Sequence, residues 1–153
     1  MKQLCISFIL LFLVHSGLSQ AELHPNLENF KNELSLIQKN WNLFLEKDSS
    51  HHIILEIAKK DVNVLKKRFS RAEKQLYKYK KILVDNEADT TYHENVIDFI
   101  EEHWGHAQDD MINLKDDFNS YIDSSNEKDY NSALYHNSKM LDRITTILNY
   151  LNK

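Results

Sequence analysis

Apolar residues recur along most of the chain at alternating spacings of three and four, the pattern of helices that each bury one stripe. The pattern occupies four segments, and we expect helices at about residues 26–47, 51–84, 91–122 and 126–152. The links between them are only a few residues long, and short links make consecutive helices antiparallel neighbours. The sequence therefore predicts an all-α fold, an elongated antiparallel up-down-up-down four-helix bundle.

The four apolar stripes define the expected core. In chain order they comprise Leu27, Phe30, Leu34, Ile37, Trp41 and Phe44; Leu55, Ala58, Val62, Leu65, Phe69, Ala72, Leu76, Tyr79 and Leu83; Ile97, Ile100, Trp104, Ala107, Met111, Leu114, Phe118 and Tyr121; and Tyr130, Leu134, Asn137, Leu141, Ile144, Leu148 and Leu151. At helical spacing, aromatic residues are more often core than the lining of a ligand pocket. Asn137 is the one polar residue on the fourth stripe, and we interpret it as a buried amide that fixes helix register, the alternative being a ligand contact.

Local signals mark where three of the helices begin. Pro25 stands just before the first stripe, where proline readily starts a helix. Thr91 with Glu94, and Ser124 with Glu127, have the spacing of capping boxes, in which the two side chains satisfy free amide groups of the first turn. These signals predict helix starts close to residues 26, 91 and 126.

The N-terminus has the pattern of an export signal. Lys2 is followed by an apolar run over residues 4–14 and then by the small residues Gly17 and Ser19. The run is shorter than the about 20 apolar residues that span a membrane. We therefore expect a signal peptide at residues 1–19, cleaved to release a secreted, extracellular single domain at residues 20–153. Cleavage would also remove Cys5, the chain's one cysteine, so the mature domain would contain no disulfide.

Composition and motifs argue against catalysis. Two glycines and one proline leave few turn residues for a sheet, and no glycine-rich phosphate loop can be built. The chain has neither the Glu-x-x-His pairs of di-iron bundles nor the His-Glu-x-x-His of zinc proteases. We therefore expect a protein that is not an enzyme and has no cofactor.

One group of side chains has the spacing of a metal site. His103, His106 and Asp110 are separated by three and four residues, which places them on one flank of the third helix. Imidazole and carboxylate are ligands of zinc and copper. The sequence thus offers a three-ligand metal site, although neighbouring His and Asp residues are also common on solvated acidic helices.

Charge is distributed unevenly between the second and third helices. Residues 59–81 contain ten Lys and Arg against two acidic residues, and residues 85–129 contain fourteen Asp and Glu against two lysines. Attraction between neighbouring helices explains part of this pattern. The positions farthest from the apolar stripes cannot easily reach a neighbour, and they are Lys60, Lys67, Lys74 and Lys81 on the second helix and Glu102, Asp109, Asp116 and Asp123 on the third.

The lysines spaced by seven are the candidate binding site. We expect them to dock an extracellular protein or an anionic glycan or lipid surface, with an attraction that weakens as salt rises. Simple solubility is the competing explanation. Nucleic acid is not expected, because the chain has a net charge of -4 and an export signal. The candidate residues are Lys60, Lys67, Lys74 and Lys81, flanked by Arg68, Arg71 and Lys78.

Four apolar residues lie off the main stripes of the first two helices: Leu36, Leu43, Ile57 and Val64. Pairing of these helices would bring them to the same side of the bundle. We expect them to widen the core, and if exposed they would form a patch for protein or lipid.

These observations favour a secreted, monomeric, non-enzymatic binding protein of the effector or secreted-factor type. A first alternative is a carrier of lipid or another small hydrophobic ligand that opens its bundle, which resembles exchangeable apolipoproteins in architecture: export, amphipathic helices and no disulfides. Further alternatives are a helical cytokine-like receptor ligand and an arthropod salivary or venom protein directed at host proteins. The last rests on frequent Asn, Lys, Ile and Tyr.

Overall fold

The computed structural model describes residues 23–45, 51–85 and 91–153, so the expected signal peptide at 1–19 lies outside it. Within these ranges the chain is all-α. It forms helices α2 (Pro25–Leu45), α3 (His51–Asp85), α4 (Thr91–Ser124) and α5 (Glu127–Leu151), with no strand. These bounds agree with the predicted ones to within two residues wherever the chain is described.

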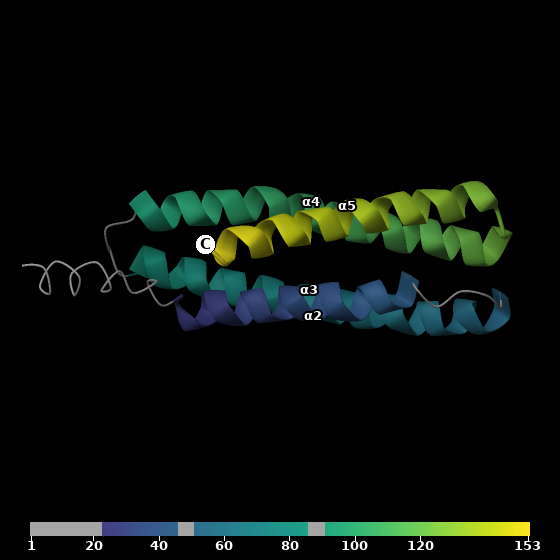
Figure 1. The fold of residues 1–153 in the computed structure, drawn as a ribbon, viewed down its shortest axis with the longest axis horizontal. Helices are drawn as coiled ribbons and strands as arrows, with labels where there is room; N and C mark the ends of the chain where they lie inside the picture. Colours follow the sequence, from purple (N-terminus) through teal and green to yellow (C-terminus); the bar gives the residue numbers. More distant parts are fainter. Residues whose placement is uncertain (1–22, 46–50, 86–90) are drawn as a thin grey trace, which may run out of the picture.

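The four helices lie alongside one another along a common long axis (Figure 1). The longest is α3, with 35 residues or about 52 Å, and the shortest is α2, with 21 residues. The backbones of α4 and α5, and those of α2 and α3, stay close over more of their length than the backbones of α2 and α5 or of α3 and α4. The molecule therefore consists of two close helix pairs with a wider space between them. None of the helices described has the length and apolar character needed to cross a membrane.

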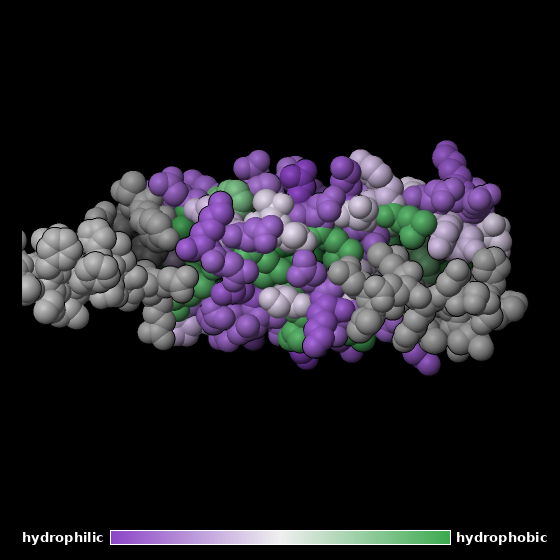
Figure 2. Space-filling model, in the orientation of Figure 1, coloured by the Kyte–Doolittle hydropathy of each residue, from purple (hydrophilic) through white to green (hydrophobic). Residues whose placement is uncertain are grey.

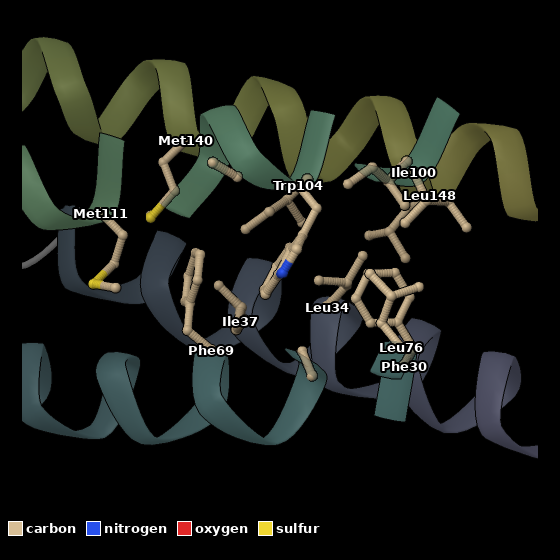
Figure 3. Packing of buried hydrophobic residues seen from close by; sticks show 14 of the residues in the cluster. Phe30, Leu34, Ile37, Phe69, Leu76, Ile100, Trp104, Met111, Met140 and Leu148 are labelled. Carbon is tan, nitrogen blue, oxygen red and sulfur yellow. The ribbon is translucent and has the colours of Figure 1, made fainter. Parts of the chain in front are cut away.

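Large apolar side chains fill the space between the two pairs. Trp104 of α4 stacks on Phe69 of α3, with ring centroids 4.8 Å apart, and meets Phe30 of α2 edge-on at 5.4 Å. Figure 3 shows these rings together with Leu34 and Ile37 from α2. This cluster joins three helices through direct contact, and burial of its aromatic area stabilises the packing of these helices.

The predicted stripes of the first three helices are confirmed where side chains are described. Their members are buried from Leu27 to Trp41, from Val62 to Tyr79 and from Ile97 to Phe118, while Leu83 and Tyr121 are partly buried. The remaining predicted members lie outside the described side chains, and they are Phe44, Leu55 and Ala58.

The predicted stripe of α5 is wrong in part. Tyr130 and Leu134 are exposed, and Leu141 is only partly buried. The residues buried in their place are Ala133, Met140 and Ile147. Both stripes have helical spacing and share Asn137, Ile144, Leu148 and Leu151, so periodicity alone could not separate them; close packing against α4 turns the alanine and methionine inward.

The capping box predicted at the start of α5 is also wrong. Ser124 is the last residue of α4, and its hydroxyl donates to the carbonyl of Ser120. The cap is Asn126, whose side-chain oxygen accepts a 3.0 Å hydrogen bond from the amide of Lys128. Asn126, two residues after Ser124, therefore satisfies the free amide of the first turn. Between the end of α4 at Ser124 and this cap, only Ser125, with φ 54, remains to reverse the chain direction. The first helix, α2, begins at Pro25, close to its predicted start. The capping box predicted for α4 involves Thr91, whose side chain lies outside the described part.

Asn137 is buried, as predicted, and its partner is now identified. Only 3% of its surface is exposed, and its Oδ1 accepts a hydrogen bond from the indole Nε1–H of Trp41 on α2. A second contact between the same helices joins the amide of Gln38 to the hydroxyl of Thr145 at 2.8 Å. Residue numbers rise along α2 as their partners' numbers fall along α5. A buried polar pair of this kind sets which turns of two helices stand side by side.

Candidate binding face

The four lysines spaced by seven, here called the lysine row, are all exposed on α3. Each row lysine stands two residues before a residue of the apolar stripe, for example Lys67 before Phe69 and Lys74 before Leu76. Two residues turn a helix by about 200°, so burial of the stripe points the row away from the core. None of the four makes an ion pair with another described residue. The other row members are Lys60 and Lys81.

The flanking basic residues divide into two groups. Arg71 and Lys78 are exposed beside the row. Arg68 is instead half-buried between helices, where its guanidinium nitrogen lies 2.9 Å from the carboxylate of Glu33 on α2. Its Nε is buried with no hydrogen-bond partner in the described part of the chain. Arg68 is therefore committed to packing α3 against α2, and it does not extend the basic face.

An acidic counterpart, here called the acidic row, runs along α4 beside the lysine row. Its members are Glu102, Asp109, Asp116 and Asp123, and all are exposed. Asp116 has a contact of 3.5 Å with Lys115 of its own helix, and the row has no other ion pair among the residues described. Two exposed rows of opposite sign thus lie on neighbouring helices.

The junction between the two rows is defined by two contacts from α3 to α4. Lys80 pairs with the carboxylate of Glu101, and Gln108 donates a 3.1 Å hydrogen bond to Glu73. These contacts use one flank of each helix and leave the outward rows free. The attraction that we expected between the oppositely charged helices is therefore provided by side chains outside the two rows.

Two of the three predicted metal ligands have other contacts. The His103 ring lies 4.6 Å from that of Phe99, and its Nδ1 lies 3.5 Å from Arg143. Asp110 contacts His136 at 2.8 Å, and His106 is exposed. Across the described ranges no group of three His, Cys, Asp or Glu side chains is arranged to hold a metal ion. We therefore propose no metal site.

His136 of α5 is a polar residue whose role the sequence did not suggest. Its Nδ1 lies 2.8 Å from Asp110 and its Nε2 lies 3.9 Å from Asp117, two turns apart on α4. The spacing of seven between the two aspartates was a visible signal, but their partner on another helix was not. The group ties α4 to α5 on the side away from the lysine row.

The two described off-stripe residues do not widen the core. Leu36 is 38% exposed and Val64 is 52% exposed, so our first interpretation is wrong for them. Each lies one turn from the Glu33–Arg68 pair, which places them side by side at the α2–α3 junction. The side chains of Leu43 and Ile57 lie outside the described part. Figure 2 shows the face of the molecule formed by α2 and α5. Hydrophobic residues lie between these two helices, with hydrophilic residues on either side.

Comparison with protein-family models, with curated proteins and with solved structures gave no match to this chain.

Proposed function

We propose that this chain is a secreted, non-enzymatic binding protein that acts on an anionic extracellular partner through the lysine row of α3. In this proposal a signal peptide is cleaved after residue 19, and the mature chain is an antiparallel up-down-up-down bundle. The reversed order of residue numbers in the contacts from α2 to α5 supports that topology.

The observation that carries the proposal is the exposure of all four row lysines without a partner among the described residues. Lys60 and Lys81 are 21 residues apart on one continuous helix, so the row extends over about 32 Å. A straight row of this length matches a linear polyanion better than a compact anion. A sulfated glycan is therefore the first partner to test.

Reversal of the lysine row tests this assignment. We expect the quadruple variant with Lys60, Lys67, Lys74 and Lys81 each changed to Glu to elute from a heparin column at much lower salt than the unchanged protein. The reason is the loss of four attractive charges aligned along one helix and their replacement by repulsive ones. The measurement is the sodium chloride concentration at elution.

A matched control separates the row from net charge. The control variant changes four exposed lysines that do not form a row, so that its net charge equals that of the row variant: Lys39, Lys128, Lys139 and Lys153, each to Glu. Its elution should move much less. Equal elution of the two variants would show that the row is not the binding site.

A carrier of lipid or another hydrophobic ligand is the second candidate, and the looser backbone approach between the two helix pairs than within each pair favours it. Separation of the α2–α3 pair from the α4–α5 pair would expose Trp104 and the rings around it to lipid. We then expect the tryptophan emission to shift when mature protein is mixed with phosphatidylcholine or phosphatidylserine vesicles. Unchanged spectra with both vesicle types would exclude the carrier.

A further inference from the structure

The contacts between α3 and α4 fix how the two charged rows are aligned. Moving seven residues back along α3, from Lys80 to Glu73, corresponds to moving seven residues forward along α4, from Glu101 to Gln108. The two helices therefore run in opposite directions in this contact. This alignment allows the height of every row member along the bundle axis to be compared.

Each row lysine stands nearly level with one member of the acidic row. By the alignment above, Lys74 is level with Ala107, which is two residues or about 3 Å from Asp109. Because both rows repeat every seven residues, the same small offset applies to all four levels. The complete set is Lys81 with Glu102, Lys74 with Asp109, Lys67 with Asp116 and Lys60 with Asp123.

Between the rows, the face contains exposed apolar side chains. Tyr77 lies one turn from both Glu73 and Lys80, so it belongs to the flank of α3 that meets α4, yet it is 67% exposed. On α4, Ile112 lies one turn after Gln108 and is 50% exposed. The face thus has two exposed apolar side chains beside the Lys80–Glu101 and Glu73–Gln108 contacts, with a charged row on each side.

Gly105 is a second, independent indication at the same place. It lies one turn from Glu101 and nearly level with Tyr77, in the interior of α4, where glycine is less favourable than alanine. A Cβ atom added to Gly105 would meet nothing within 4 Å in the described part of the chain, so no described neighbour requires a glycine. Glycine in such a position allows a backbone from outside to approach closely.

We propose that the α3–α4 face binds a second copy of this chain, with a two-fold axis parallel to the helices. Such an axis places α3 of one copy over α4 of the other, at the same height. The lysine row of each copy then lies on the acidic row of its partner, and the same patch is used twice. A two-fold axis across the helices would place lysine on lysine. The arrangement replaces the monomer expected from the sequence. It goes beyond the proposed function because it also uses the acidic row, and an anionic partner would then compete with the second copy for the lysine row.

Sedimentation velocity of the mature chain tests the dimer. We expect twice the monomer mass at about 20 mM salt and the monomer mass at about 500 mM, because exposed ion pairs are screened as salt rises. A monomer at both salt concentrations, at the highest protein concentration that stays soluble, would overturn the proposal.

Two charge-reversed variants make the test specific. In the first, Lys67→Glu and Lys74→Glu are combined, and in the second, Asp109→Lys and Asp116→Lys. Each should raise the dissociation constant by about tenfold or more, since like charges then face each other at the central levels. An equal mixture of the two variants should form a heterodimer, because every acidic side chain in a row of one copy then faces a basic side chain of the other.

Formation of the heterodimer in the mixture would show that both variants are folded. Far-UV circular dichroism of each variant checks this independently. A mixture that stays monomeric, or either variant dimerising like the unchanged protein, would contradict the arrangement. The second variant keeps all row lysines, so it should still bind heparin. Loss of the dimer and loss of anion binding are therefore distinguishable.

Gly105→Ala tests the centre of the face. We expect this variant to have a higher melting temperature as a monomer at high salt, because alanine favours the helix. We also expect weaker self-association at low salt, because the new methyl group occupies the point of closest approach. The control is Ser138→Ala at an exposed position on α5, which should leave self-association unchanged. Stronger or unaltered self-association in Gly105→Ala would overturn the proposed centre.

Discussion

Replacing Trp104 by alanine is expected to lower the free energy of unfolding by about 3–5 kcal/mol, the range for truncation of a buried tryptophan. Trp104 is 4% exposed and contacts Phe69 on α3 and Phe30 on α2. The variant would therefore lose contacts that join both helix pairs. Because domains are stable by only about 5–15 kcal/mol, urea unfolding followed by circular dichroism should show a large shift of the midpoint.

Two further variants separate the causes of that loss. Tyr135→Ala removes an aromatic ring that is 58% exposed and should change stability by less than about 0.5 kcal/mol. Trp104→Phe keeps an aromatic ring against Phe69 and removes an indole N–H that is buried without a partner in the described part of the chain. It should lose clearly less than Trp104→Ala. A loss below about 1 kcal/mol in Trp104→Ala would mean that the space between the pairs is not tightly packed.

Replacing Asn137 by alanine is expected to cost about 1–3 kcal/mol, because it removes the buried oxygen that accepts the hydrogen bond of Trp41. Urea unfolding again provides the measurement. Asn137→Leu keeps a side chain with the same branching and removes the same acceptor, so a comparison of the two variants separates the hydrogen bond from the cavity. The matched control is Asn131→Ala, at an exposed position of the same helix. Equal stability of the Asn137 and Asn131 variants would show that the buried amide is unimportant.

Helix position and outward direction could be predicted because both follow from local periodicity. Exposure of Lys67 and Lys74 is one example, since burial of Phe69 and Leu76 determines it within a single helix. The buried side of α5 could not be predicted, because two stripes fit its spacing and only contact with α4 selects Met140 over Leu141.

On the candidate binding face too, contacts between helices could not be predicted from the sequence of a single helix. The commitment of Arg68 to Glu33 depends on which turn of α2 lies beside α3. The levels of the lysine and acidic rows depend on how far α4 is displaced along α3, which the Lys80–Glu101 and Glu73–Gln108 contacts reveal. Displacement along the axis is a property of packing between helices, and no helix carries it in its own sequence.

The close approach of α2 to α3, and of α4 to α5, also bears on how fast the chain folds. Most backbone contacts between helices join elements that follow one another in sequence, and only the α2–α5 contacts connect the first helix to the last. Proteins dominated by such local contacts have a low contact order and fold within microseconds to milliseconds. If the chain is exported and its signal peptide cleaved, as we propose, the loss of Cys5 would let the mature domain reach its native state without waiting for oxidation.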